Sequence, residues 1–265
     1  MSTPQTKAWA EPLIKGFQPY LVQPLPKRLS ALCVDGIAVG VVRSSVLTKV
    51  AHADGLSALF TPCSVDGPFS KKGLTVKRSD WSLCQERLLQ YFDIEPLHEA
   101  IPLPLASRDL TIDRALCRTL GIPTQVVRLV WEENGHILLA RRAATKRINP
   151  GLWDNPAAGM IRSGETPEEA LLREAQEEAS LVPKEDICQS LSFSTQRPLL
   201  SGILRETTFV THVRRSTSKR TVPYALDREV EEFGWFSMAH LQSLLSTGKI
   251  VPEASYATLL ALATN

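Results

Sequence analysis

Strand-like runs of apolar and polar residues recur along the second half of the chain. The clearest run, 125–143, alternates with period two and is interrupted at Asn134-Gly135. Alternation of this kind is typical of a half-buried strand, and Asn-Gly is the strongest short signal for a hairpin turn. We therefore predict a β-hairpin at 124–143. Later runs predict three further strands, at 190–196, 205–215 and 228–237.

Helical spacing replaces alternation in three places after this hairpin. Residues 238–248 and 252–264 have the composition of two closing helices. Within 159–181, Thr166 and Glu169 have the spacing of a capping box, and Pro167 suits the first helical position because its missing N–H leaves no unpaired donor. These residues predict a helix from Pro167 to about Ser180.

The first 110 residues have a pattern of their own. We predict strands at 36–42 and 56–62, a helix at 81–92, an exit segment at 101–110 and a joining helix at 111–122. Together the elements predict an α/β protein in two parts, an N-terminal α+β domain over residues 1–110 and a mixed-sheet α/β/α sandwich over residues 111–265.

Composition and charge exclude several classes of protein. With 43% hydrophobic and 22% charged residues, the 265-residue chain is ordinary globular material. A net charge of +2 argues against binding to a nucleic acid polymer. No signal peptide or membrane-length apolar run is evident, and the five scattered cysteines favour reduced thiols. We therefore expect a cytoplasmic protein with no membrane partner. A homodimer is a further possibility.

Three glutamates of the predicted helix share one face. At about 100° per residue, Glu174, Glu177 and Glu178 fall within roughly one third of the helix circumference. Like charges at this spacing repel by a few tenths of a kcal/mol per pair. Most such clusters are solvated surface, but Mg²⁺ prefers carboxylate oxygens together with waters and substrate phosphates. The cluster is therefore a candidate metal site.

The spacing around these glutamates carries a family resemblance. Gly159, Glu165, Arg173, Glu174, Glu177 and Glu178 stand at the defining positions of G-x5-E-x7-R-E-U-x-E-E-x-G-U, where U is apolar. The segment thus resembles the Nudix box, and only Ser180 departs, standing where the family has its late glycine. The resemblance implies the Nudix fold and hydrolysis of a diphosphate joined to an organic group.

The same resemblance implies roles for individual residues. Glu174, Glu177 and Glu178 match the ligands of Mg²⁺, or alternatively Mn²⁺, and the carbonyl of Ala158 is a further candidate. Arg173 and Glu165 match the positions that orient those carboxylates and anchor the loop. Glu174 is the first candidate for the general base, with a loop glutamate further along the chain as its rival.

Other candidate residues lie outside the box. Glu229 is the candidate for an additional metal-binding carboxylate, and Glu231 and Glu232 compete with it. A basic cluster before the box can bind the diphosphate, and its members are Arg141, Arg142, Lys146 and Arg147. Trp153, Asp154 and Asn155 are candidates to line a pocket for an aromatic ring of the substrate. A buried Trp is more often a core residue.

Segments around the box narrow the expected substrate. Residues 145–159, the end of the box, 227–233 and 248–254, together with the N-terminal part, resemble Nudix hydrolases related to the partner domain of fungal thiamine pyrophosphokinase. This resemblance implies hydrolysis of thiamine diphosphate or its oxidised forms to the monophosphate plus phosphate.

Several alternatives stay open. ADP-ribose, NADH, coenzyme A and oxidised nucleotides are other candidate substrates, and Pro198 lies near the place where a proline accompanies ADP-ribose hydrolysis. A non-catalytic ligand-binding protein tends to lose box glutamates, which this chain retains. Isomerase chemistry on the same fold needs a cysteine and a glutamate, and no cysteine matches that position by sequence.

Overall fold

The larger of the two parts is built on a mixed sheet. In the computed structural model, which describes residues 4–66, 71–106, 109–146, 148–183, 186–226 and 228–264, the main strand order is β11-β12-β7-β8-β13, with β10 beside β7 and β9 beside β8. Strand β12 runs parallel to β7, and the other pairs are antiparallel. The strands are β7 (Thr124–Glu133), β8 (His136–Arg142), β9 (Trp153–Asp154), β10 (Ala157–Met160), β11 (Ile187–Leu199), β12 (Gly202–Arg215) and β13 (Val230–Ser237).

The predicted hairpin is confirmed. Strands β7 and β8 pair with Glu133 opposite His136, and the two residues between them, Asn134 and Gly135, have φ values of 47° and 73°. Positive φ at both central positions is the signature of a type I′ turn, which suits the right-handed twist of the strands.

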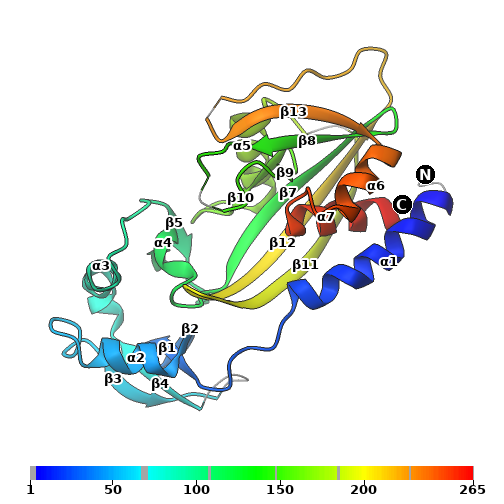
Figure 1. Cartoon of the computed structure of the whole chain (residues 1–265). Helices are drawn as coiled ribbons and strands as arrows, with labels where there is room; N and C mark the ends of the chain where they lie inside the picture. Colours follow the sequence, from blue (N-terminus) through cyan, green and yellow to red (C-terminus); the bar gives the residue numbers. More distant parts are fainter. Residues whose placement is uncertain are drawn as a thin grey trace.

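Helices cover both faces of this sheet (Figure 1). Helix α5 (Pro167–Ala179) packs on one face, where Val127, Leu129 and Trp131 of β7 point toward it. The opposite face packs against α7 (Pro252–Ala263), with α6 (Met238–Ser246) and α1 (Pro4–Leu21) completing that layer. The predicted α/β/α sandwich is therefore confirmed.

A small α+β part precedes the sandwich, as predicted. Its sheet has the order β2-β1-β4-β3, and its core is separate from the two cores of the sandwich. Its elements are β1 (Leu29–Val34), β2 (Ile37–Arg43), α2 (Ser44–Ala51), β3 (Thr61–Ser64), β4 (Lys72–Val76), the 3₁₀ turn η1 (Arg78–Asp80), α3 (Trp81–Phe92), β5 (Ala100–Pro102), β6 (Thr111–Asp113) and α4 (Arg114–Cys117).

Two local predictions in this region were wrong. The strand predicted at 56–62 is a series of turns until Phe60, and extended structure begins only at Thr61. The helix predicted at 111–122 is confined to α4, because its first residues form β6 against β5. Cross-strand pairing there outweighs the helical spacing of the apolar residues.

Helix α1 was not predicted, and its position bears on the division of the chain. Although it lies within the first 110 residues, α1 packs mainly on α7 and also contacts β11. Its Trp9, Leu13 and Phe17 join the apolar cluster beneath α7. The boundary at residue 110 stays a prediction.

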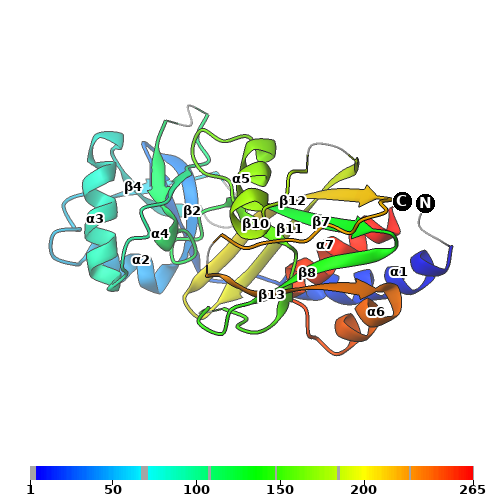
Figure 2. The same cartoon turned by 90° about the horizontal axis from the view of Figure 1, so that it is seen from above.

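Backbone contacts fix the two parts against each other (Figure 2). The Ser163 N–H donates to the Ala100 carbonyl at 2.9 Å, and the Ile203 N–H donates to the Arg118 carbonyl at 2.8 Å. Every helix in the described part of the chain is too short or too polar to span a lipid bilayer.

Candidate functional site

Helix α5 carries the glutamate cluster, and the sequence sets both of its ends. The Thr166 hydroxyl accepts from the Glu169 N–H at 3.2 Å, and the Glu169 carboxylate accepts from the Thr166 N–H at 2.8 Å. Both halves of the predicted capping box are thus present, and Pro167 occupies the first turn. Ala170, Leu171, Ala175 and Ala179 are buried on the sheet, which fixes the rotation of the helix.

The C-terminal end of α5 shows how Ser180 takes the place of the late glycine of the box. Ser180 has φ 52° and caps the helix in the left-handed conformation, where its N–H donates to the Ala175 and Gln176 carbonyls. A non-glycine residue pays about 1–2 kcal/mol for this conformation. Two further carbonyls of the last turn accept from the N–H groups of Tyr224 and Leu226, so the segment after β12 helps to hold the helix end.

Arg173 accounts for the crowding of negative charge. Its guanidinium binds both oxygens of Glu165, at 2.6 and 2.9 Å, and donates to Glu174 at 2.6 Å and to Glu177 at 3.4 Å. A fifth contact joins it to the Met160 carbonyl. The Arg173 contact is the main reason that the pKa of Glu165 lies below its usual value. One partly buried cation therefore ties the loop to the helix and orients the Glu174 and Glu177 carboxylates.

Gly159 permits the approach of Glu174 to the sheet. A Cβ atom on Gly159 would lie 1.9 Å from Oε1 of Glu174, so no other residue fits at this position without moving the carboxylate. This contact gives the box glycine a steric reason that does not involve an unusual backbone angle.

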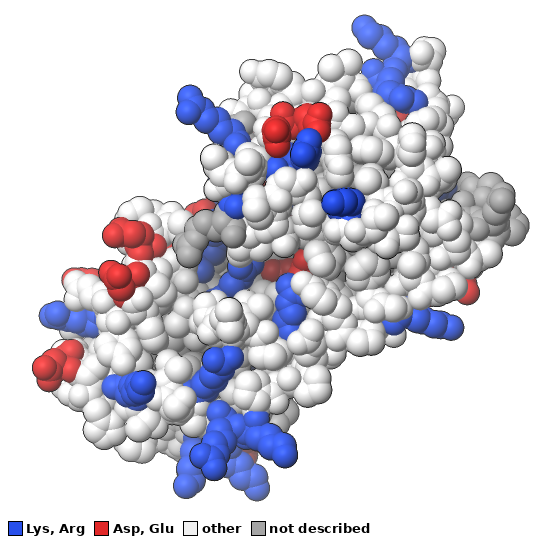
Figure 3. All heavy atoms as spheres, in the orientation of Figure 1, with Lys and Arg blue, Asp and Glu red and all other residues white. Residues whose placement is uncertain are grey.

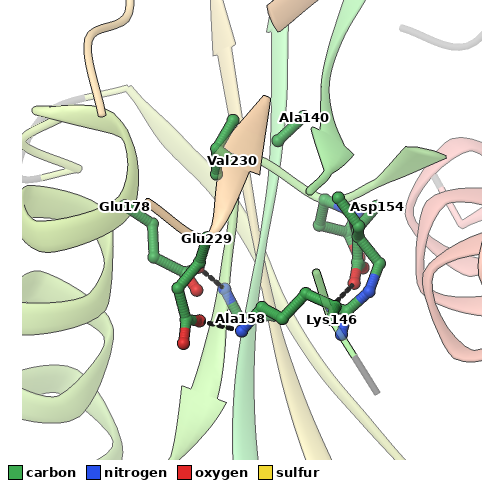
Figure 4. Close-up of a pocket in the computed structure, with 9 residues that line it drawn as sticks. Ala140, Lys146, Asp154, Ala158, Glu178, Glu229 and Val230 are labelled. Carbon is green, nitrogen blue, oxygen red and sulfur yellow. Dashed lines mark hydrogen bonds and ion pairs between the residues drawn. The ribbon is translucent and has the colours of Figure 1, made fainter. Parts of the chain in front are cut away.

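A small hollow that is open to solvent lies beside α5 (Figure 4). Inside it, the Glu178 carboxylate accepts from the Ala158 N–H at 2.8 Å, Lys146 forms an ion pair with Glu229, and Arg142 donates to Asp154 at 3.0 Å. We call this hollow the Glu178 pocket. It is lined by Ala140, Arg142, Lys146, Asp154, Asn155, Ala158, Glu178, Glu229 and Val230.

The chemistry of this pocket fits a hard cation. Burial raises the pKa of Glu178 well above its usual value, and the negative charges of Glu174, Asp154 and Glu229 raise it further. A bound divalent cation would relieve this electrostatic cost, and oxygen donors are the ligands that Mg²⁺ prefers. No preassembled cage of three or more acidic, histidine or cysteine side chains occurs in the described part of the chain. Waters and substrate oxygens would therefore complete the coordination.

The structure brings only some of the predicted residues together. Arg142, Lys146, Asn155, Ala158, Glu178 and Glu229 line the Glu178 pocket, whereas Glu165, Arg173 and Glu174 form the charged network beside it. Of the three candidate glutamates before and in β13, only Glu229 reaches the pocket. Glu231 and Glu232 pair instead with Arg141, which does not line the pocket either.

Three other candidates lie apart from the pocket. The Glu177 side chain is about half exposed, and Arg173 is its one recorded side-chain partner among the described residues. Trp153 packs edge to face against Phe236, as a core residue does. Pro198 pairs with Ile203 near the turn between β11 and β12. Arg147, the fourth residue of the basic cluster, lies outside the described residues.

Sequence reasoning missed Arg128. This side chain is 8% exposed and donates to Asp154 at 2.6 Å and to Asn155 at 3.3 Å, so it backs two residues of the pocket. The sequence does contain a signal for this residue, since Arg128 is a charged residue inside the apolar strand run VVRLVW. A charge buried there requires a partner of opposite charge.

All five cysteines lie away from the pocket. Cys33, Cys63, Cys84 and Cys117 belong to the N-terminal part, and Cys188 is exposed on β11. None of them is among the pocket-lining residues in the described part of the chain. The arrangement offers carboxylates, cations and backbone groups, but no thiol.

Comparison with known proteins agrees with this geometry. A family model described as the NUDIX domain matches residues 122–258. Among curated proteins, isopentenyl-diphosphate Delta-isomerase of Brevibacterium linens is 31% identical over 148 residues, 56% of this chain and 78% of that protein. The enzyme of the same name from Salmonella typhi is 28% identical over 142 residues, 52% of this chain and 76% of that protein.

Two solved structures are also similar. One is a bifunctional NMN adenylyltransferase/ADP ribose pyrophosphatase from Francisella tularensis, complexed with AMP and a Mn ion, with 17% identity and a TM-score of 0.46 over 54% of this chain and 42% of that one. The other is the NUDIX domain of Shewanella oneidensis NrtR with ADP ribose, with 19% identity and a TM-score of 0.40 over 53% of this chain and 85% of that one. The chain thus spans less than half of the Francisella protein, and likeness at this level carries no argument about activity.

Proposed function

The chain belongs to the Nudix family, and from that premise we propose that it hydrolyses a diphosphate joined to an organic group, with Mg²⁺ or Mn²⁺ as cofactor. The observation that carries the proposal is the buried Glu178 carboxylate, which shares one pocket with Lys146 and Arg142. Carboxylates for a metal and cations for phosphoryl oxygens are the two requirements of phosphoryl transfer.

One group of residues is proposed to hold the metal ion. Glu174, Glu177, Glu178, Glu229 and the Ala158 carbonyl are the candidate metal ligands. When bound, the metal supplies Lewis-acid polarisation of the phosphoryl oxygens and a bound water of lowered pKa.

A second group of residues is proposed to bind the substrate and to position the carboxylates. Lys146 and Arg142 bind the diphosphate oxygens, with Arg141 as a more distant candidate, and Asn155 contacts the organic group. Arg173 and Glu165 keep the carboxylates in position. Glu174 is our first candidate for the base that accepts the proton of the attacking water, and Glu229 is the rival further along the chain.

We further propose thiamine diphosphate, or an oxidised form of it, as the substrate and the monophosphate plus phosphate as products. The support is the sequence resemblance of the segments before, within and after the box to hydrolases of that kind. ADP-ribose, NADH and other nucleoside diphosphate derivatives are the alternative.

An isomerase reaction on isopentenyl diphosphate is a second candidate, favoured by the 31% identity to an enzyme of that name. Isomerase chemistry on this fold uses a cysteine paired with a glutamate. The positions of the five cysteines, all away from the Glu178 pocket, favour hydrolysis over this alternative.

The test is phosphate and monophosphate release with Mg²⁺ from thiamine diphosphate, oxothiamine diphosphate, ADP-ribose, NADH, coenzyme A, 8-oxo-dGTP and isopentenyl diphosphate. Proton NMR on the last compound detects isomerisation. A tenfold preference in kcat/KM for the thiamine compounds, about 1.4 kcal/mol, supports the narrow proposal.

Glu178→Gln tests the mechanism in the same assay. We expect it to reduce turnover more than about a hundredfold with little change in Tm, because it removes a charge that electrostatic stabilisation requires. Glu168→Gln is the matched control, since Glu168 is an exposed glutamate on the same helix. Near wild-type turnover in Glu178→Gln contradicts the proposal.

A further inference from the structure

Part of the face of the larger sheet that packs against α7 is polar, beside the apolar cluster that includes Val130, Val210 and Leu259. Strands β7, β11 and β12 place buried polar side chains there, and α7 adds others from the opposite side. Those with little exposure are Thr124, Arg128, Thr195, Thr208, Glu253 and Thr258. Burying polar groups between a sheet and a helix costs free energy unless each finds a partner.

Several side-chain atoms on this face have no hydrogen-bond partner among the described residues. Arg128 Nε, Thr195 Oγ1 and Arg197 Nη1 are buried without a hydrogen bond, and only one other such side-chain atom, in Gln189, occurs in the described ranges. Thr195 lies directly opposite Glu206 in the β11–β12 register. We call the five residues Arg128, Thr195, Arg197, Glu206 and Thr208 the β7–β12 polar face. Unsatisfied donors and acceptors gathered in one place indicate a surface that a ligand completes.

One carboxylate of this face has no ion-pair partner among the described residues. Arg128 is paired with Asp154 at 2.6 Å, and Arg197 is paired with Glu253 at 2.7 Å. Glu206 has no such pair: its nearest recorded partner is the Thr208 hydroxyl at 3.4 Å, and no described cation lies within ion-pair distance of it. Arg118 and Arg128 act on Glu206 only at longer range, and burial raises its pKa. The Glu206 side chain is only partly exposed, so its carboxylate has neither a cation beside it nor full hydration.

The β7–β12 polar face is continuous with the Glu178 pocket. One oxygen of Asp154 accepts from Arg128 and the other accepts from Arg142. Asn155 lines the pocket and donates to Thr258 of α7 at 3.1 Å. These two residues therefore form a wall shared by both sites. Figure 3 shows charged atoms of both signs in the hollow where the two parts of the molecule meet.

We propose that the β7–β12 polar face binds the organic group of the diphosphate substrate and that Glu206 selects a positively charged nitrogen heterocycle there. This inference rests on the proposed function, because the Glu178 pocket must hold the diphosphate. Thr195 and Arg128 supply the remaining hydrogen bonds to the ring. A substrate whose organic part is neutral or anionic leaves the Glu206 carboxylate without a partner, so this inference favours thiamine diphosphate over oxothiamine diphosphate, whose thiazolone ring is neutral.

The experiment compares the full-length protein with Glu206→Gln, which keeps the size of the side chain and removes its charge. With Mg²⁺, kcat/KM is measured on thiamine diphosphate, whose thiazolium ring is cationic, and on ADP-ribose. Glu206→Gln is expected to lose about tenfold or more on thiamine diphosphate, mainly through KM, and to change little on ADP-ribose. Glu206→Ala is the second variant, and Glu231→Gln is the control because Glu231 is exposed and lies outside both sites.

A binding measurement without metal separates this inference from the proposed function. Calorimetry with thiamine, which has no phosphate, is expected to give about tenfold weaker binding to Glu206→Gln than to the wild type. If the wild type hydrolyses diphosphates while both Glu206 variants lose activity equally on all substrates, the inference is wrong and the proposed function stands. If thiamine binding depends on Glu206 but no diphosphate is hydrolysed, the proposed function is wrong. Equal thiamine binding by wild type and variants overturns the inference.

Discussion

Strand β7 supports two unlike contacts on its two faces. Toward α5 it presents Val127, Leu129 and Trp131 to an apolar cluster, whereas toward α7 it presents Arg128 in the β7–β12 polar face. The apolar contact positions the box helix and needs no ligand to be complete. The polar contact holds buried atoms without partners, so it is less stable than an apolar equivalent. The α7 side also carries an apolar cluster that includes Val130 and Val210, so its polar residues form a patch within a contact that is otherwise apolar.

The apolar face should give the largest effect on stability. Leu129 is fully buried, so Leu129→Ala removes contacts and leaves a cavity, and we expect a loss of about 2–5 kcal/mol in the free energy of unfolding. Urea denaturation measures this loss. Leu200→Ala is the matched control, because Leu200 is fully exposed and the same truncation there should change little. A loss below about 1 kcal/mol in Leu129→Ala would mean that the contact with α5 is loose.

A second prediction concerns a polar contact on the α7-facing side that is satisfied. Glu132 accepts from Arg214 at 2.8 Å and contacts the His212 ring at 3.2 Å. Burial alone raises the pKa of Glu132, but the bonds from His212 and Arg214 outweigh burial and hold this pKa below its usual value. A lowered carboxyl pKa contributes stability above the unfolded pKa of about 4.3, and this stability is lost as the pH falls through the folded value.

Glu132→Gln should therefore cost about 1–3 kcal/mol at pH 7, and the difference from the wild type should shrink below about pH 4. Denaturation curves at pH 7 and at about pH 3.5 give both numbers. A difference that stays constant over this range would show that the charge of Glu132 contributes nothing.

The smallest effect is expected at an unsatisfied hydroxyl. Thr195 is 1% exposed and its Oγ1 has no partner, so Thr195→Val should leave stability unchanged or raise it by up to about 1 kcal/mol. Thr221→Val is the matched control, because the Thr221 hydroxyl donates to Glu133 and its removal should destabilise the protein. Destabilisation by Thr195→Val comparable to that of the control would mean that this hydroxyl is satisfied within the protein.

The sequence predicted the elements whose signals are local. The hairpin at Asn134-Gly135 and helix α5 with its capping box were predicted closely, as was α3 at Trp81–Phe92. Turn chemistry and caps act between neighbouring residues, so one chain displays them directly. The strand predicted at 56–62 was wrong because an apolar composition does not reveal whether a strand partner exists.

The candidate site was predictable to a similar extent. The box spacing located the charged network of Arg173, whose contacts are one helical turn or one loop away. Neither Arg128 nor Glu206 was found, because their surroundings come from strands far apart in sequence and from α7. Arg141 and Arg142 are adjacent in sequence, but the alternation of β8 sends only Arg142 into the pocket.

The ion pair between Lys146 and Glu229 has a consequence for the life of the protein in a cell. A chain whose acidic pocket relied wholly on an external cation would unfold and be degraded whenever that cation became scarce. Here Lys146 is part of the chain itself, so the Glu229 carboxylate of the pocket is neutralised whether or not a metal ion is bound. Under the proposed function, removal of the metal ion would then lower activity without unfolding the protein.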